Sequence, residues 1–185
     1  MTEKPKKTRG GSKLSRSEVT TVRLDPKLRY LAELAARKQR RTLSSFIEWA
    51  VQESLERIPL REGVDHPPNI GSEAEYLWDV DAADRLVRLA MRYPELLTHE
   101  EQLLWKLIRE NGYFWRGRFA DGGHGRWRWS ILEETLMLDR VREFWPTLLS
   151  VASGGLGADS MPKWYIDEAD QVIAGYDMKN WNVLE

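Results

Sequence analysis

The sequence has no cysteine and only three histidines among its 185 residues. A chain without cysteine forms no disulfide and offers no thiolate to a metal ion. The three histidines, His66, His99 and His124, stand far apart, and no two of them have the spacing of a zinc site. We therefore expect the protein to bind no metal and to carry no cofactor.

Long apolar runs and glycine-rich phosphate loops are missing as well. No segment reaches the roughly 20 apolar residues that cross a membrane, and no secretory signal is recognisable. Neither a Walker-type loop nor a dinucleotide-binding glycine motif occurs, so we treat the resemblance of residues 167–170 to a helicase box as chance. We expect a cytoplasmic, nucleoid-associated protein that makes no membrane contact and is not an enzyme.

Charged side chains are divided unevenly along the chain. Residues 1–57 contain 14 Lys+Arg and 7 Asp+Glu, a net charge of +7, whereas residues 58–185 contain 14 Lys+Arg and 22 Asp+Glu, a net charge of −8. The near-neutral total therefore hides a basic part and an acidic part. A basic N-terminal part favours a polyanionic partner, which it would bind with an affinity that falls steeply with salt.

The most basic segment is residues 1–16. It holds six Lys or Arg side chains against one acid, Glu3, and Gly10-Gly11-Ser12 adds flexibility. We interpret it as a disordered arm whose side chains, such as Lys13 and Arg16, follow the DNA backbone. The alternative is a tail that only increases solubility.

Residues 17–57 predict a short strand followed by two helices. Residues 19–24 alternate with the period of two that is typical of a half-buried strand. Asp25 as N-cap and Pro26 at the first helical position begin one helix, and Thr42 is a good N-cap for the next. Apolar residues then recur at helical spacing, namely Leu28, Leu31, Ala32, Leu34 and Ala35, followed by Leu43, Phe46, Ile47, Ala50, Val51 and Leu55.

This ordered set resembles the ribbon-helix-helix family of DNA-binding repressors, over about 41 of the 185 residues. The matching features are the alternating strand, the Asp25-Pro26 helix start, and Thr42-x-Ser44 at the start of the second helix. The family usually has glycine between its helices, where this chain has Arg40. Because a residue other than glycine costs roughly 1–2 kcal/mol in a left-handed conformation, we expect this turn to use another geometry.

The resemblance implies an intertwined homodimer. A module of about 45 residues buries too little surface to fold alone. Two chains would therefore pair their strands into an antiparallel ribbon and interlock their four helices. The core of this dimer is expected to contain Val22, Leu24, Leu31, Phe46, Ile47 and Ala50.

The resemblance also implies how the dimer contacts double-stranded DNA. The polar face of the ribbon would enter the major groove, with Val19, Thr21 and Arg23 against the bases. Arg23 suits bidentate contact with guanine. Backbone phosphates would be held by Lys13, Arg16, Arg41, Thr42, Ser44 and Ser45.

The alternative for the whole segment is an edge strand and a helical hairpin inside a larger core.

The sequence divides further into a linker and a second domain. Residues 17–58 form the DNA-binding module, residues 59–72 are rich in proline and glycine and predict a linker, and residues 73–185 are long enough for a second core. We expect this second domain to be mostly helical, with a weakly alternating segment at residues 163–177 that is compatible with a terminal hairpin.

The sequence predicts three helix N-termini in the second domain. The first is expected at Ser72, Asp79 or Asp81, and the second at the capping box that begins with Thr98. A third box begins with Ser130 and predicts a helix that continues toward Pro146, which is expected to kink or end it.

Residues 113–129 predict a β-hairpin, because two alternating aromatic and basic runs flank a glycine-rich turn. We expect its aromatic face to complete the helical core, since the surrounding helices need apolar cover. The alternative is a second nucleic-acid contact. The expected aromatic face consists of Trp115, Phe119, Trp127 and Trp129, and the opposite face of Phe114, Arg116, Arg118, Arg126 and Arg128.

The sequence therefore predicts a mainly α protein with short β segments. An N-terminal ribbon-helix-helix module would form a homodimer that reads DNA, and a helical C-terminal domain would add higher-order assembly or hold a protein partner. A transcriptional repressor is the first interpretation. The alternatives are a plasmid transfer or partition accessory protein and a toxin-neutralising antitoxin.

Overall fold

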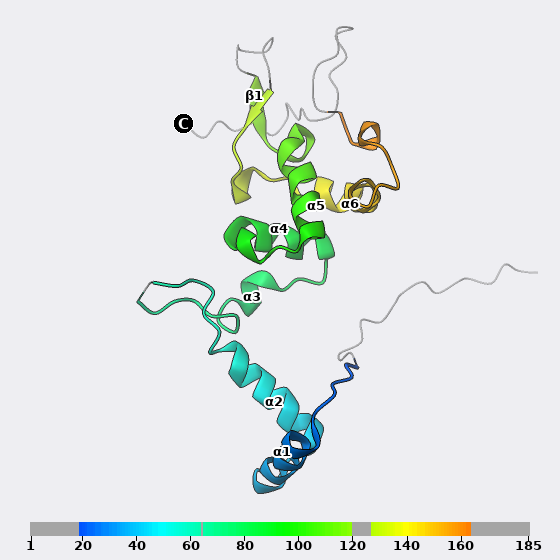
Figure 1. The fold of residues 1–185 in the computed structure, drawn as a ribbon. Coiled ribbons are helices and arrows are strands. Elements are labelled where there is room, and N and C mark those ends of the chain that lie inside the picture. Colours follow the sequence, from blue (N-terminus) through cyan, green and yellow to red (C-terminus); the bar gives the residue numbers. More distant parts are fainter. Residues whose placement is uncertain (1–18, 64, 120–126, 164–185) are drawn as a thin grey trace, which may run out of the picture. The chain divides into compact units, whose positions relative to one another are not determined.

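The computed structural model describes residues 19–63, 65–119 and 127–163 of the chain (Figure 1). Within these ranges the chain is mainly helical, as the sequence predicts. It divides into two compact units, Met1–Glu53 and Ser54–Glu185, and each is described by itself. Residues 164–177 of the predicted terminal hairpin lie outside the described residues.

The first unit contains α1 (Pro26–Lys38) and most of α2 (Leu43–Leu55). Helix α1 begins as predicted, because the Asp25 carboxylate accepts hydrogen bonds of 3.0 Å from the backbone N–H groups of Lys27 and Leu28. The Thr42 hydroxyl accepts a 3.1 Å hydrogen bond from the Ser45 N–H and thereby caps α2. Both helices lie where the sequence predicts them.

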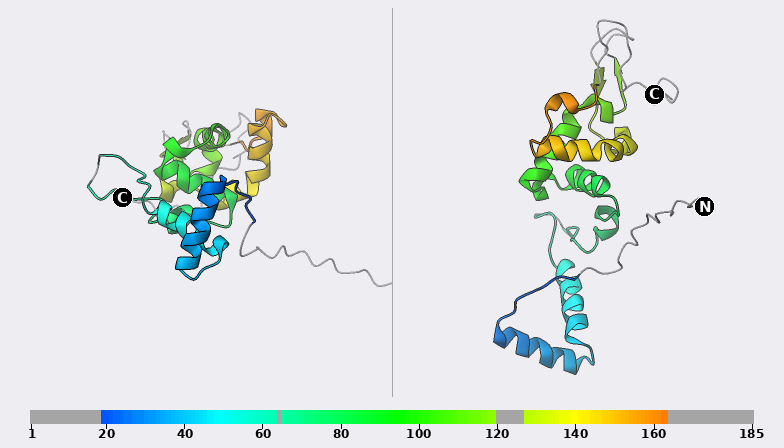
Figure 2. Two further views of the ribbon diagram at one scale, coloured as in Figure 1. Left: turned by 60° about the horizontal axis from the view of Figure 1, so that its bottom comes forward. Right: turned by 90° about the vertical axis from the view of Figure 1, so that its right-hand side faces the viewer.

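The second unit is built around three helices, α4 (Ala82–Arg92), α5 (His99–Glu110) and α6 (Leu138–Ala152). They pack against one another in pairs, and Figure 2 shows them from two further sides. The shorter α3 (Ala74–Leu77) packs against α4. Four 3₁₀ turns complete the described helical structure of the unit, at Pro94–Leu96, Gly112–Phe114, Glu133–Thr135 and Ala158–Ser160.

Local capping explains the first two long helices of this unit. Of the three predicted starts for α4, Asp81 is the one used, because its carboxylate accepts a 2.8 Å hydrogen bond from the Ala83 N–H. Helix α5 has the predicted capping box, in which Thr98 and Glu101 each accept a hydrogen bond from the other's backbone N–H.

The predicted start of the third helix is wrong. The helix does not open at Ser130 but at Leu138, because the intervening chain is held in other contacts. The Thr135 hydroxyl donates to the Ser130 carbonyl at 2.7 Å, and Leu136 forms an isolated antiparallel bridge with Trp115. Pro146 does not end the helix, which continues to Ala152.

The core of the second unit joins these helices to the segment that follows α5. Ile108, Phe114, Trp115, Val141 and Leu148 are all completely buried. The indole N–H of Trp115 donates to the Ile108 carbonyl at 2.8 Å, so the largest of these side chains is also satisfied as a donor. Apolar burial on this scale is absent from the described part of the first unit.

Two three-residue strands, β1 (Gly117–Phe119) and β2 (Trp127–Trp129), pair antiparallel with Gly117 opposite Trp129. The expected opposite face is wrong in one residue. Phe114 is completely buried, because residues 112–114 form a 3₁₀ turn rather than a strand. Trp115 and the half-buried Trp129 do pack on the helical core.

Several of the residues assigned to these two faces are not described at the level of their side chains. For Arg118, Phe119 and Trp127 the structure describes the backbone alone, and Arg126 lies outside the described residues. Their assignment to a face stays a prediction.

The predicted linker, residues 59–72, carries its own backbone hydrogen bonds. Pro59 and Asn69 form an isolated antiparallel bridge, and the Leu60 N–H donates to the Pro68 carbonyl at 2.8 Å. The Arg61 guanidinium lies over the ring of Tyr93, 5.6 Å from its centre. These contacts place the described residues of this stretch within the second unit.

Just beyond this stretch, an ion pair ties the start of α3 to the end of α4. A hydrogen bond of 2.7 Å from Arg92 is the main reason why the pKa of Glu73 is lowered. The same guanidinium lies 3.6 Å from the ring centre of Tyr76. Desolvation and a hydrogen bond to Glu133 raise the pKa of Tyr76.

A buried ion pair joins α4 to α6. Asp84 is 1% exposed and accepts two hydrogen bonds from Arg142, at 2.8 and 2.6 Å. These bonds are the main reason why the pKa of Arg142 is raised. Arg142 also bonds Asp139 at 2.8 Å, but that carboxylate is 95% exposed.

The described residues contain neither a membrane-spanning helix nor a cluster of metal-binding side chains. None of their helices is long and apolar enough to cross a membrane. No group of three or more His, Cys, Asp or Glu side chains among them could hold a metal ion.

We predict that Arg142→Met lowers the free energy of unfolding of the second unit by about 3 kcal/mol, because it leaves the Asp84 carboxylate buried without its partner. This is the low end of the usual range, since the Arg142 side chain is itself 42% exposed. Urea unfolding followed by tryptophan fluorescence measures the change. Asp139→Asn is the matched control and should cost less than about 1 kcal/mol. Equal losses in the two variants would contradict the importance of the buried pair.

Candidate nucleic-acid interface

The predicted ribbon segment precedes α1 and is open to solvent. Residues 19–25 form no strand in the single chain. Val19 is 99% exposed and Val22 is 61% exposed, and Thr21 and Arg23 are exposed as well. The described residues of this unit include no strand with which this segment could pair, and the ribbon stays a prediction that needs a second chain.

The turn between α1 and α2 differs from the geometry expected for it. Arg40 has a φ of 55° and therefore occupies the left-handed conformation that the family gives to glycine. The Arg40 N–H donates to the Arg37 carbonyl at 3.1 Å, and the Arg41 N–H donates to the Ala36 carbonyl at 2.9 Å. This pair of bonds is a Schellman motif, which offsets the cost of the unusual conformation.

The start of α2 gathers four of the predicted phosphate contacts. Arg41, Thr42, Ser44 and Ser45 follow one another closely in the chain, and all four are exposed. The first turn of α2 carries no acidic side chain, so the positive end of the helix dipole is not neutralised from within. This turn has the chemistry of an anion-binding helix start.

Arg41 has a partner that the sequence prediction did not assign to the site. Its guanidinium lies over the indole of Trp49, 5.5 Å from the ring centre, and Trp49 in turn contacts Phe46 with 5.7 Å between ring centres. Stacking leaves the N–H edge of a guanidinium available for a phosphate. The only signal in the sequence was a tryptophan on the helix that follows a basic pair.

The first unit has almost no buried interior of its own. Among its described residues only Ala32 and Ala36 are buried, at 9% and 3% exposure. Of the six residues predicted for the dimer core, Val22 and Leu31 are 61% and 49% exposed, and the other four are half-buried: Leu24, Phe46, Ile47 and Ala50. Further apolar side chains on the two helices are also exposed, namely Leu28, Tyr30, Leu34 and Val51.

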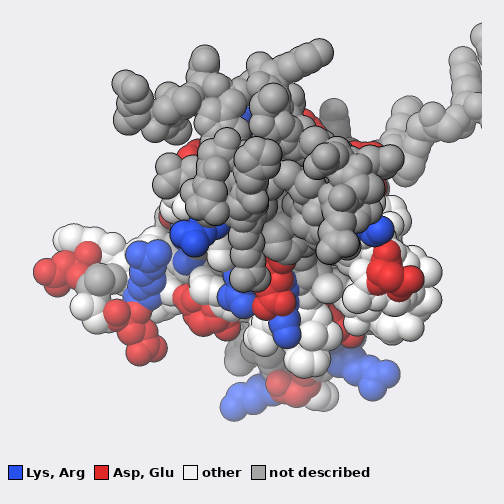
Figure 3. Space-filling model, turned by 90° about the horizontal axis from the view of Figure 1, so that it is seen from above, with Lys and Arg blue, Asp and Glu red and all other residues white. Residues whose placement is uncertain are grey.

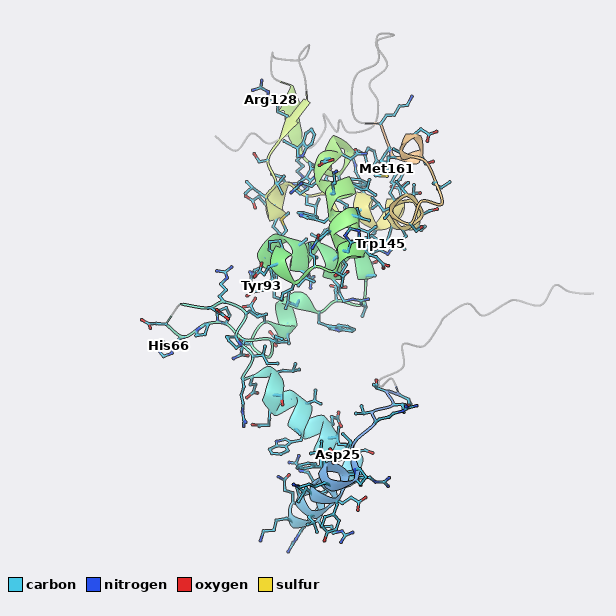
Figure 4. The ribbon with its side chains drawn as sticks, viewed as in Figure 1. Asp25, His66, Tyr93, Arg128, Trp145 and Met161 are labelled. Carbon is cyan, nitrogen blue, oxygen red and sulfur yellow. The ribbon has the colours of Figure 1, made fainter. Side chains whose placement is uncertain are left out.

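The structure places the described site residues in two groups of this unit. The predicted base contacts lie before α1, which Figure 4 locates by its N-cap Asp25, and four of the predicted phosphate contacts lie at the start of α2. Lys13 and Arg16, the remaining phosphate contacts, are outside the described residues.

The second unit gives less support to a nucleic-acid contact. Arg116 and Arg128 are exposed, but Trp115 is buried and Trp129 donates its indole N–H to the Arg109 carbonyl at 3.1 Å. These two rings are therefore occupied within the fold rather than presented to bases. On the face in Figure 3, the described basic and acidic side chains lie beside one another.

Comparisons of the chain with protein-family models, with curated proteins and with solved structures gave no match. The resemblance to the ribbon-helix-helix family therefore rests on the residues themselves.

We predict that Arg40→Gly stabilises the first unit by up to about 1.5 kcal/mol. Removing the strain of the left-handed conformation raises the free energy of unfolding by roughly 1–2 kcal/mol. The greater flexibility of glycine in the unfolded chain lowers it again by roughly 0.5–1 kcal/mol. Hydrogen exchange of the amides in α1 and α2 measures the change. Gln39→Gly is the matched control, because Gln39 has a φ of −87° and gains nothing from glycine. Its exchange should become faster, and slower exchange in both variants would contradict the argument.

Proposed function

We propose that the protein is a homodimeric, sequence-specific DNA-binding protein that acts by binding rather than by catalysis, in the manner of a transcriptional repressor. The observation that supports the proposal is the open first unit, in which capped helices carry apolar side chains that the described residues of the unit leave exposed. A helical pair of this size is stable only when something else covers that surface. A second copy of the same unit is the partner that the family resemblance implies.

The proposed dimer also accounts for the alternation of residues 19–24. When two such segments pair antiparallel, Val22 and Leu24 turn toward the helices and Val19, Thr21 and Arg23 turn away from them. The outward set contains one guanidinium, one hydroxyl and one small apolar group, which suit guanine, several bases and a thymine methyl group respectively.

The proposed phosphate contacts would fix the ribbon in the groove. An anion at the start of α2 would meet backbone N–H groups, two serine hydroxyls and the guanidinium of Arg41. The basic residues 1–16 would add sequence-independent attraction, because each cation that neutralises a phosphate releases a counterion. The second unit would serve assembly or a protein partner, since its net charge is negative.

We predict that Arg23→Ala weakens binding to the preferred site by about 1–3 kcal/mol and relaxes the preference at one base position. Selection from random duplex DNA, followed by affinity measurement on the selected site, tests both effects. Lys38→Ala removes the same charge from the end of α1 and should leave the preference unchanged. Deletion of residues 1–16 should weaken all sequences alike and flatten the salt dependence. If Arg23→Ala selects the wild-type site with wild-type affinity, the base-contact assignment fails.

We predict that Val22→Asp and Val19→Asp behave differently, although both valines are exposed in the single chain. Val22→Asp would bury a charge in the first-unit dimer core and abolish the pairing of the first units together with DNA binding. Val19→Asp would place the charge on the outer face, so the dimer would form but repel DNA. Sedimentation equilibrium and DNA-binding measurements on both variants check this. A Val22→Asp protein that still dimerises through the first unit would exclude the ribbon.

A further inference from the structure

The second unit has a small apolar pocket at its surface, between α4, α5 and α6. Its volume is about 340 Å³, and its apolar walls include Leu86, Leu89, Leu104 and Trp145. Of these four residues, Figure 4 labels Trp145. Arg85 and Glu101 supply two side chains of opposite charge to the same pocket. A pocket of this size lies at the lower end of the range of roughly 300–1,000 Å³ for ligand sites, which leaves room for one aromatic side chain.

A large apolar side chain is exposed next to this pocket. Trp78 follows α3 directly and is 65% exposed, and its neighbour Val80 is 67% exposed. The Arg85 guanidinium lies over the Trp78 ring, 5.0 Å from its centre, and donates to the Asp79 carbonyl at 2.6 Å. Because Arg85 both holds Trp78 and lines the pocket, the exposed ring and the pocket are adjacent parts of one surface.

We propose that this surface binds a second copy of the chain, with Trp78 of each copy seated in the pocket of the other. A two-fold interface must be self-complementary. An exposed ring beside a pocket that can hold it meets this condition, because one pair of chains then forms two equivalent ring-in-pocket contacts. The opposite charges support the same arrangement, since Arg85 of one copy can face Glu101 of the other. Tryptophan and arginine are also the residue types that most often dominate binding energy.

This interface lies in the second unit and does not depend on the ribbon. If the first units also pair, they raise the effective concentration of the second units and strengthen the contact without new interactions. The two interfaces must therefore be separated experimentally. Leu31→Glu, a change at an exposed position of α1, removes the first-unit dimer and leaves the second unit intact.

The experiment measures the dissociation constant of the full chain by sedimentation equilibrium in the Leu31→Glu background. We expect this variant to dimerise, and addition of Trp78→Ala to raise the dissociation constant by at least about tenfold. Leu156→Ala is the matched control, because Leu156 is 46% exposed but does not line the pocket, and it should change nothing. The proposal would be overturned if the Leu31→Glu protein were monomeric, or if Trp78→Ala left its dissociation constant unchanged. The pocket would then be left to another partner.

A mixing experiment tests the exchange of Trp78 itself. Ala82→Trp fills the pocket from its own wall, so this variant offers a ring but no pocket, whereas Trp78→Ala offers a pocket but no ring. In the Leu31→Glu background each variant alone should dimerise weakly, and a mixture should form more dimer because the mixed pair keeps one of the two contacts. A mixture no better than its components would exclude the exchange.

These outcomes are distinguishable from failure of the proposed DNA-binding dimer. If wild type and Leu31→Glu have the same dissociation constant, the first-unit dimer fails while the effect of Trp78→Ala still reports on the second unit. The comparison of Trp78→Ala with wild type, without Leu31→Glu, gives an independent reading should that change unfold the first unit.

Discussion

The constraint on the first unit is that its described residues bury very little of its apolar surface within one chain. Helices α1 and α2 have 13 residues each, and the two buried residues of the described part are alanines, the smallest apolar side chains that pack. Burial at roughly 25 cal/mol per Å² cannot offset the ordering of some 35 residues when so little area is removed from water. If the unit pairs as we propose, its folding and its assembly are coupled, and its stability would depend on protein concentration.

The second unit has the opposite character. Three helices and the segment after α5 enclose six completely buried side chains, including Trp115, and the Asp84–Arg142 pair fixes α4 against α6. Its described core is formed by residues of a single chain. The described core does not include the exposed apolar side chains of this unit, of which Trp78 is the largest, so these side chains are available for recognition.

Sequence reasoning succeeded where a side chain bonds the backbone within three residues, as at Asp25, Asp81 and Thr98. It failed where distant contacts decide: the bridge between Trp115 and Leu136 delays α6, a fact that no local pattern encodes. At Arg40 the residue preference was outweighed by two hydrogen bonds of the turn. For the candidate site, the positions of the side chains along the chain were predictable. Their arrangement as a ribbon is not visible in one chain, because the proposed pairing strand would belong to another copy.

The two proposed interfaces have a joint consequence for DNA recognition. One ribbon offers about three side chains per strand, and each good base contact is worth roughly 1–3 kcal/mol, so a single dimer discriminates modestly. Two different self-complementary surfaces on one chain join copies in two independent ways. When both contacts fall within one pair, the second unit only strengthens the dimer. When they join different pairs, each ribbon dimer is linked to the next one. Several dimers then bind adjacent DNA sites together, and specificity rises because the modest discrimination of each dimer adds to that of the others.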